Sequence, residues 1–303
     1  MINFLDKLYS SINDKDDFFK LLRINTLLRF LIRWSCNIYA PIYFTMQSKK
    51  PSLAEYKERE TQIIVSLTSF PPRINRLWIV IECLLSQDLK PDRIILWLSK
   101  DQFKSEGNLP KKLENLKKRG LEVIYVEGDI KSHKKYFYSI KDFSDSIIIT
   151  IDDDIFYPNY FIQKLYSDHL NYPNTIICNR GKEIISNMRN GYNDWPQLVE
   201  QKGPSKKIFF TSGGGTLFPP NSLHKDVLNK DTFMKACKDA DDVWLNYMAL
   251  LANTMIFKTS HYSALIPVIS RNNKHLYSHN LFEDGNNIYI KNLEKIYNIK
   301  IAD

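Results

Sequence analysis

Three consecutive aspartates, Asp152, Asp153 and Asp154, directly follow the apolar segment 146–151. Carboxylates this close together repel one another unless a cation lies between them. Two carboxylates spaced two residues apart at a strand end point the same way, and their oxygens suit Mg²⁺ or Mn²⁺, which can also hold a diphosphate. Alternatively, one aspartate caps the helix predicted over 159–170 and the others are solvated. Because capping accounts for one acid and not three, we favour a divalent metal site.

A second acidic pair, Asp241 and Asp242, comes directly before an apolar stretch with helical spacing. A carboxylate that does not ligate a metal can act as a general base and take the proton of an attacking hydroxyl. The competing interpretation is structural, because acids are favoured at helix N-termini as caps and as partners of the helix dipole. We favour catalysis, because the pair follows the aspartate triplet and a glycine-rich motif in chain order.

Other segments could hold a phosphate or a sugar. Arg73 lies in the loop predicted over 68–73, and its guanidinium can bind a diphosphate through two hydrogen bonds or be solvated. Lys134 and Lys135 can neutralise phosphate charge or form a solvated basic helix face. The three glycines at 213–215 allow positive φ and close approach of a ligand, or they form a tight hairpin turn.

The elements that must position these residues alternate between strands and helices. Apolar, β-branched runs predict strands over 62–67, 93–98, 121–126 and 146–151. Helical spacing or flanking Pro and Gly predict helices over 77–85 and 110–120. Strands this apolar are buried on both faces, so the pattern predicts an α/β fold with a parallel sheet. Ligands of such sheets bind at the carboxyl ends of strands, which makes a nucleotide-binding fold the leading candidate.

Composition excludes several classes of protein. The 303 residues are 44% hydrophobic and 13% aromatic, which is enough for one large core or two smaller ones and excludes long disorder. The four cysteines are far apart and form no CxxC pair, so we expect reduced thiols in a cytoplasmic protein and no structural zinc site.

The first 50 residues differ from the rest in charge. Lys and Arg exceed Asp and Glu by 42 to 34, a net charge of +8, and residues 1–50 contribute eight basic and four acidic residues, or +4. The segment has neither the pattern of a secretory signal nor the length of a membrane-spanning helix. It is a basic, aromatic-rich, amphipathic stretch, which can lie on an anionic membrane surface or pack on the catalytic body.

Six sequence pieces, in chain order, carry a resemblance to a known family: IVSLTSFPPRI, PDRIILWLS, HKKYFY, IIITIDDDIFYP, FFTSGGGTLFPP and ADDVWL. Together they resemble bacterial glycosyltransferases of the GT-A fold, and most of all the glycosyltransferase family 2-like enzymes of capsule and lipopolysaccharide assembly. The resemblance covers about residues 61–270 and leaves the N-terminal segment unexplained. It implies a nucleotide-binding sheet fused to an acceptor-binding half.

The resemblance also assigns roles to residues. It implies that Asp152 and Asp154 hold Mn²⁺ or Mg²⁺, which bridges the diphosphate of a nucleotide-sugar donor, UDP-linked by expectation. It implies donor contacts from Thr68, Arg73, Lys135, Asp152, Asp153, Gly214 and Gly215. Asp242 would be the general base of an inverting transfer and Asp241 the reserve candidate. Trp195 is a candidate for the acceptor side. His275 and His279, which lie in no matched motif, are candidates for a further metal ligand.

These expectations combine into a metal-dependent hexosyltransferase with two parts. Residues 1–58 form an α-helical extension, and 59–303 form the GT-A domain, with a donor half over 59–157 and an acceptor half over 158–303. The acceptor is a glycan or a polyprenyl-linked glycan, and the protein is cytoplasmic, with residues 1–50 on the inner membrane surface as one interpretation. A phosphotransferase or nuclease acting on a polyanion and a non-catalytic glycan-binding protein are the alternatives, although no basic-aromatic nucleic-acid module is present.

Overall fold

A computed structural model describes residues 1–12, 24–47, 50–53, 59–103, 109–186, 188–189, 191–198, 203–260, 263–270 and 285–301. The four predicted strands are present, with helices between them. In chain order the elements are β1 (Ile63–Thr68), α4 (Pro71–Leu85), β2 (Arg93–Ser99), α5 (Lys111–Lys117), β3 (Leu121–Val126), α6 (Lys134–Asp142), β4 (Ile147–Thr150), β5 (Ile155–Phe156) and α7 (Phe161–Asn171). Helix α4 begins at Pro71, earlier than predicted, because proline suits the first turn of a helix.

In the second half of the chain, the described residues add short strands and the helices α8, α9 and α11. They are β6 (Ile176–Cys178), β7 (Gly181–Glu183), β8 (Ile208–Phe210), β9 (Thr216–Phe218), α8 (Lys230–Ala236), α9 (Asp241–Leu251), β10 (Ile256–Lys258), β11 (Ile266–Pro267) and α11 (Gly285–Tyr297). Before the first strand, the part of the chain that the structure describes contains helices α1 (Ile2–Ser11) and α3 (Ile24–Met46). This is the expected mixed α/β architecture with an α-helical N-terminal extension.

The central sheet has seven strands in the order β10-β6-β9-β4-β1-β2-β3. Strand β1 pairs in parallel with both β2 and β4, and Ser66 of β1 lies opposite Thr150 of β4. The prediction of a parallel sheet holds for most pairs, but β9 runs antiparallel to its neighbours β4 and β6. Because β1 and β4 are parallel neighbours, their carboxyl ends meet at one edge of the sheet.

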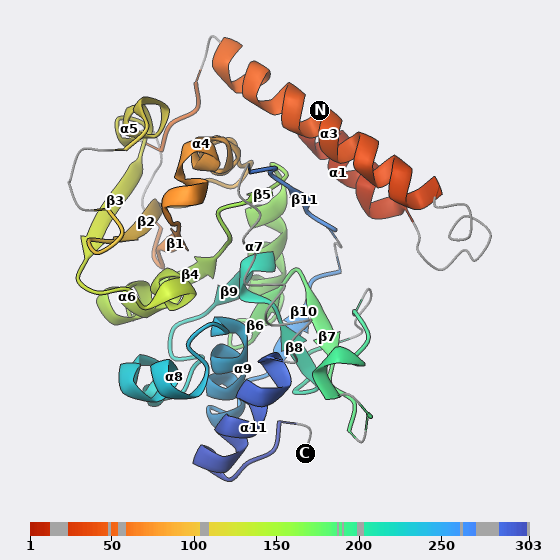
Figure 1. Cartoon of the computed structure of the whole chain (residues 1–303), viewed down its shortest axis with the longest axis vertical. Coiled ribbons are helices and arrows are strands. Elements are labelled where there is room, and N and C mark those ends of the chain that lie inside the picture. The colour runs from red at the N-terminus through yellow and green to blue at the C-terminus, as the bar shows by residue number, and fades with distance from the viewer. Residues whose placement is uncertain are drawn as a thin grey trace.

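Both faces of the sheet are covered, as the apolar strands require (Figure 1). Alternate residues of β1 point to opposite sides: Ile63 and Val65 join the core that includes α4, whereas Ile64 joins a smaller cluster with β2, β3, β4 and α6. A second large core, built around Trp244 and Tyr247 of α9, holds the second half together. All four cysteines are buried and unpaired, as expected of thiols.

The N-terminal helices belong to the same packed body as the sheet. Ile32, Cys36, Ala40 and Phe44, spaced four residues apart on α3, are buried in the core that contains β1 and α4. On α1, buried Asp6 accepts hydrogen bonds from Tyr160 Oη at 2.6 Å and Ser263 Oγ at 2.7 Å. The domain boundary predicted at residue 58 adjoins residues 54–58, which lie outside the described residues.

Helix α3 differs from the basic amphipathic helix that the sequence predicts. Arg29 points at α1, where its Nη2 donates to Ile12 O at 3.0 Å and its guanidinium lies over the Tyr9 ring. Opposite its buried face, α3 exposes a further set of apolar side chains, among them Trp34 and Ile38. No helix among the described residues is long and apolar enough to cross a membrane.

Candidate active site

The aspartate triplet lies at the carboxyl end of β4, in the turn that leads into β5. Its three side chains are not equivalent. The side chains of Asp152 and Asp154 are 40% and 22% exposed, whereas that of Asp153 is only 6% exposed. Asp153 and Asp154 lie in the turn itself, where Asp153 packs against Ser69 and Arg73 and its two neighbours stay accessible. Asp152 and Asp154 therefore face outward, and Asp153 faces the protein.

Asp153 anchors the triplet to the end of β1 and to α4. It accepts hydrogen bonds from Ser69 Oγ at 2.5 Å and from Arg73 Nη1 at 2.7 Å. Burial raises the pKa of the Asp153 carboxyl, and Arg73 opposes that rise. Arg73 Nη2 also lies 3.1 Å from Asp154 Oδ2. In this structure the arginine expected at the diphosphate pairs with two carboxylates of the triplet.

Asp154 is held through its backbone as well as through Arg73. Val268, just past β11, donates its N–H to Asp154 O at 2.7 Å. Burial, followed by the negative charge of Asp153, raises the pKa of the Asp154 carboxyl to about 7. The strand pair β5–β11 thus supports the triplet from the side of α3.

Lys135, at the start of α6, joins the triplet to the second acidic pair. Its side chain is buried, and its Nζ lies 3.0 Å from Asp152 Oδ1 and 2.9 Å from Asp241 Oδ2. The backbone of Lys135 is fixed to the sheet, because Ser66 Oγ of β1 donates to its carbonyl at 2.5 Å. Two acidic clusters that are almost ninety residues apart in the chain therefore meet at one ammonium group. The neighbouring Lys134 pairs instead with Asp129.

Asp241 and Asp242 lie in the first turn of α9, where the sequence left a capping interpretation open. Neither carboxylate caps this helix, whose N-cap is Ala240 without a side-chain hydrogen bond. Both bind Ser212 instead: Asp241 Oδ2 accepts from Ser212 Oγ at 2.5 Å, and Asp242 Oδ1 accepts from Ser212 N at 2.7 Å. The helix dipole still favours the two negative charges, but their hydrogen bonds are directed at the glycine-rich loop.

The protein environment shifts the pKa values of these two carboxyl groups in opposite directions. Burial would raise the pKa of Asp241, but the ammonium of Lys135 and other donors outweigh it and lower the pKa to about 2. Burial, together with the charge of Asp241, raises the pKa of Asp242 to about 7. At neutral pH, Asp241 is ionised and paired, whereas Asp242 exchanges a proton. Carboxyl groups whose pKa values are pushed apart in this way are typical of acid–base catalysis.

The glycine-rich loop packs directly on the metal-ligand candidate Asp152. A Cβ on Gly213 would lie 1.8 Å from Asp152 Oδ2, so no larger residue fits there without moving the carboxylate. Gly215 has φ +91°, and a Cβ there would lie 2.0 Å from the Phe161 ring. The flanking strands β8 and β9 belong to different sheets. The glycines therefore do not form the hairpin turn that the sequence left open.

Several residues of the site were not predicted. Ser212 holds both acids of the second pair, and Tyr157 links the two loops: Asp152 N donates to Tyr157 Oη at 2.9 Å, and Tyr157 Oη donates to Gly213 O at 2.7 Å. Each lies within a motif that the sequence does show, the aspartate segment or the glycine segment. Their partners, however, are about 30 and 56 residues away in sequence. Local pattern alone gives no sign of such contacts.

Other predicted site residues lie elsewhere or have other contacts. Thr68, at the end of β1, donates its hydroxyl to Trp97 O of β2 at 2.8 Å. Trp195, expected as a surface aromatic on the acceptor side, is only 5% exposed, and its Nε1 donates to Ile185 O at 3.1 Å. A buried indole has no face for stacking on a sugar, so this structure does not support that assignment. His275 and His279 lie outside the described residues.

The outward carboxylates fit a hard divalent cation with few protein ligands. Lys135 contacts one oxygen of Asp152 and Arg73 one oxygen of Asp154, which leaves the second oxygen of each carboxylate for a cation. In the described part of the chain, no three His, Cys, Asp or Glu side chains form a ready-made metal cluster. Mg²⁺ is commonly bound by one or two carboxylates, with waters and substrate phosphates completing the shell. Two aspartates are sufficient for that mode of binding.

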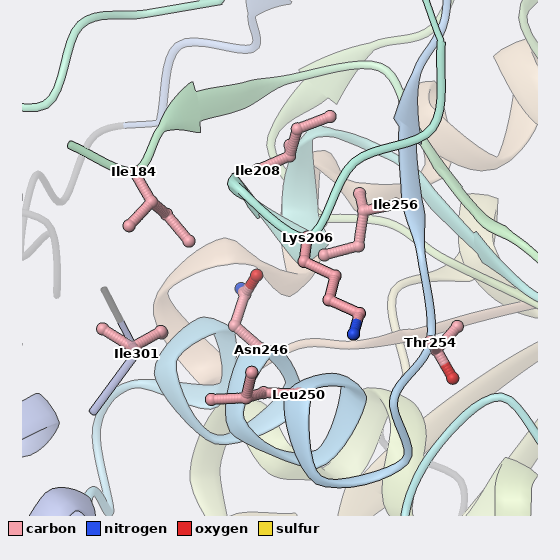
Figure 2. A pocket seen from close by; sticks show the side chains of 8 residues that line it. All are labelled: Ile184, Lys206, Ile208, Asn246, Leu250, Thr254, Ile256 and Ile301. Carbon is pink, nitrogen blue, oxygen red and sulfur yellow. The ribbon is translucent and has the colours of Figure 1, made fainter. Parts of the chain in front are cut away.

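A small apolar pocket lies in the second half of the molecule (Figure 2). Its lining comes from α9, β8, β10 and the segments next to β7, β8, β10 and α11, and consists of Ile184, Lys206, Ile208, Asn246, Leu250, Thr254, Ile256 and Ile301. None of these eight is one of the predicted site residues. Asn246 connects the pocket to the site, since its Nδ2 donates to Asp242 O at 2.8 Å. We interpret the residues around this pocket as packing that holds α9 in position.

Comparison with known proteins adds likenesses in structure. No protein-family model matches the chain, and no curated protein matches its sequence. A mannosyltransferase from Pyrobaculum calidifontis, solved with GDP-Man and Mn²⁺, aligns over 99% of this chain and 76% of its own, with 11% identity and a TM-score of 0.47. Glucosyl-3-phosphoglycerate synthase from Mycobacterium tuberculosis, solved with Mn²⁺ and UDP, aligns over 78% and 80%, with 14% identity and a TM-score of 0.42. A 4-diphosphocytidyl-2C-methyl-D-erythritol synthase from Anaerococcus prevotii aligns over 74% and 96%, with 15% identity and a TM-score of 0.45.

Proposed function

We propose that this protein is a metal-dependent glycosyltransferase that moves a sugar from a nucleoside-diphosphate donor, UDP-linked by preference, to a hydroxyl group. The observation that carries the proposal is the contact of Lys135 with Asp152 at 3.0 Å and with Asp241 at 2.9 Å. This contact unites the candidate metal site with the acidic pair that contains the candidate base Asp242, at the carboxyl end of the sheet. Such a site can hold the nucleotide-sugar donor at the metal and the acceptor hydroxyl at the base.

The residues divide the chemistry between them. Asp242 takes the proton of the attacking hydroxyl, and its pKa of about 7 matches that task at neutral pH. Ser212 N–H orients the carboxylate by binding Oδ1, which directs the second oxygen to the acceptor. Lys135 keeps Asp241 ionised. Asp152 and Asp154 would hold Mg²⁺ or Mn²⁺, which when bound offsets the negative charge of the leaving diphosphate as a Lewis acid.

The position of the base favours sugar transfer over nucleotidyl transfer. Nucleotidyl transfer to a phosphate group uses a nucleophile that is already an anion and needs no base. A hydroxyl acceptor does need one, and Asp242 has a pKa suited to the role. A base on the acceptor side, separate from the metal ligands, also supports direct displacement with inversion at the anomeric carbon. A non-catalytic glycan-binding protein would have no use for a proton-exchanging carboxylate.

The acceptor that we propose is a glycan or a polyprenyl-linked glycan in bacterial surface polysaccharide synthesis, at the inner face of the cytoplasmic membrane. A hexose is the sugar we expect. These details follow from the resemblance of the sequence motifs to family 2-like enzymes. The second half of the fold, from α7 onward, is the part that we assign to the acceptor.

A donor screen tests the proposal. The purified chain is incubated with Mn²⁺ or Mg²⁺ and a panel of nucleotide sugars, and release of nucleoside diphosphate is measured with and without EDTA. We expect metal-dependent release from one donor, loss of release in Asp154→Asn, and normal release in Asp145→Asn, which changes an exposed aspartate in a turn. Pyrophosphate release from a nucleoside triphosphate would indicate nucleotidyl transfer instead. Absence of both products and of nucleotide binding by calorimetry would contradict the proposal.

A further inference from the structure

The long N-terminal helix α3 is apolar on two opposite sides. One side is buried in the core through Ile32, Cys36, Ala40 and Phe44. The opposite side, which we call the outer face, carries Leu27, Leu31, Trp34, Ile38 and Ile42. The spacing of four, three, four and four residues places these five side chains in one stripe along the helix. Each of them is between 46% and 57% exposed.

This concentration of exposed apolar side chains is confined to one region of the molecule. Among the described residues, 17 large hydrophobic side chains are exposed, and 12 of them lie within the first 46 residues. Phe4 and Leu8 of α1, four residues apart, add to those of α3. Soluble monomers rarely expose large contiguous apolar surface, and when they do it marks a binding surface. In Figure 1 the two helices lie along the outside of the body, at one end of its long axis.

The N-terminal segment that carries the outer face is net basic. In the described part of the first 50 residues the only acid is Asp6, which is buried and bound by Tyr160 and Ser263. Lys7 and Lys50 are exposed, and the first 50 residues as a whole carry a net charge of +4. Apolar side chains with an aromatic ring among them and basic residues at the margin are typical of helices that lie in the interface of an anionic bilayer.

We propose that α3 lies flat on an anionic membrane surface, with its outer face among the headgroups and the ends of the acyl chains. The helix has 23 residues, about 35 Å at about 1.5 Å per residue, and lies on the outside of the fold, so its whole outer face can enter the interface at once. A second copy of the chain is a poorer occupant, because a symmetric dimer would bring together two N-terminal segments that each carry a net charge of +4. An anionic lipid surface complements that charge.

The docking mode deepens the proposed function, because it brings the site close to a lipid-linked acceptor. On its inner side, Asn37 of α3 donates from Nδ2 to Pro267 O at 2.9 Å and accepts at Oδ1 from Ile269 N at 2.7 Å. The residue between them, Val268, binds Asp154 O. Two hydrogen-bonded steps therefore connect α3, through this segment, to the metal-ligand candidate Asp154.

Vesicle binding tests the membrane role of the outer face and does not depend on transferase activity. Full-length chain is sedimented with vesicles of phosphatidylcholine alone or mixed with phosphatidylglycerol. The test variant is Leu31→Glu with Ile38→Glu. The control is Ile296→Glu, which charges an equally exposed isoleucine on α11 at the opposite end of the molecule. We expect the wild type and the control to bind mixed vesicles, more weakly at high salt, and the double variant to bind at least about tenfold less.

The remaining outcomes contradict either the surface assignment or the proposed function, and they can be told apart. Equal binding by the double variant would show that another face meets the lipid, and equal binding to neutral vesicles would remove the role of charge. A stable dimer in solution that the double variant dissociates would show that the occupant is a second copy. Melting temperatures within experimental error of the wild type confirm that the variants are folded. Vesicle binding without donor turnover would contradict the proposed function alone, and turnover without vesicle binding would contradict the membrane surface alone.

Discussion

At the scale of single residues, Lys135 determines how the site is charged. Its ammonium is buried between Asp152 and Asp241, so one positive group stabilises both acidic clusters. Asp241 is kept ionised by this contact, and its negative charge helps to raise the pKa of Asp242 next to it. Lys135 therefore also stabilises the fold. Removing it would leave the two carboxylates as buried charges without a partner.

The pH dependence of turnover follows from the pKa of Asp242. A general base acts only when deprotonated, so we expect kcat/KM to rise about tenfold per pH unit below pH 7 and to level off above it. The neighbours that determine this pKa are Asp241, Lys135 and Ser212. Saturating metal keeps Asp154 ionised and removes it from the profile. A pH series with the identified donor checks this, and a profile that is flat between pH 5 and about 8 would contradict the assignment of the base.

The same raised pKa has a consequence for stability. Because folding raises the pKa of Asp242 from 3.8 to about 7, the protonated form is the one favoured by the fold, and that stability is lost as pH rises from about 4 through about 7. Asp242→Asn should therefore melt higher than the wild type at pH 8, by roughly 2–4 °C for each kcal/mol relieved, with the difference vanishing below about pH 4. Thermal melts of both proteins across pH check this. A lower melting temperature at pH 8 would show that the ionised carboxylate stabilises the fold.

At the scale of elements, the short loops between strands form the site. The loop 212–215 contacts Asp152 through Gly213 and both acids of α9 through Ser212. Gly213→Ala should weaken metal-dependent donor binding about 10–100-fold, because the new methyl group displaces the Asp152 carboxylate. Gly203→Ala is the matched control, since a Cβ there meets no atom within 4 Å. Calorimetric titration of donor with metal measures both, and equal losses in the two variants would contradict the contact.

Asn37 gives a separate prediction, because it connects α3 to the segment that supports Asp154. Asn37→Leu leaves Pro267 C=O and Ile269 N–H without their partner, at about 1–3 kcal/mol for each group. We expect a lower melting temperature and weaker metal-dependent donor binding. Ser35→Ala, at an exposed position of the same helix, should change neither. If Asn37→Leu lowered only the melting temperature, the link to the metal loop would be absent.

The sequence predicted long elements better than short ones. Strands β1 to β4 are four to seven residues long and mostly apolar, and the burial of β1, β2 and β4 follows from that composition, whereas the edge strand β3 is only half-buried along its middle. Strands such as β6, β9 and β10 have three residues, too few for any periodicity to identify them. The antiparallel direction of β9 depends on contacts with two strands distant in the chain. Trp195 shows the same limit, because its burial arises from packing on Phe209 rather than from its polar neighbours in sequence.

At the scale of the whole molecule, the N-terminal helices are an integral part of the body. The inner side of α3 lies in the same core as β1 and α4, and Asp6 of α1 is buried with two hydrogen bonds to the second half of the chain. The boundary at residue 58 was predicted from a change in amino-acid composition. Composition alone cannot show that the helices before residue 58 cover the core. Which side of α3 meets protein could not be predicted, since both sides are apolar.

Truncation tests this integration. A chain that begins at residue 50 would expose the core side of α4 and lose the Asn37 contacts, so we expect insoluble or aggregating protein, or a melting temperature lower by more than about 5 °C. The outer-face variant Leu31→Glu with Ile38→Glu, which leaves the inner side intact, should stay folded. Solubility, far-ultraviolet circular dichroism and melts compare the two. A stable, fully active truncated chain would contradict a shared core.

The central claim is that one site holds the donor with its metal through Asp152 and Asp154 and activates the acceptor through Asp242. Donor binding and turnover, measured side by side in Asp154→Asn and Asp242→Asn, test it most directly. We expect Asp154→Asn to lose metal-dependent donor binding, and Asp242→Asn to bind the donor with near wild-type affinity while turnover falls about 10²–10⁴-fold. Wild-type turnover in Asp242→Asn, or unchanged metal-dependent binding in Asp154→Asn, would contradict the claim.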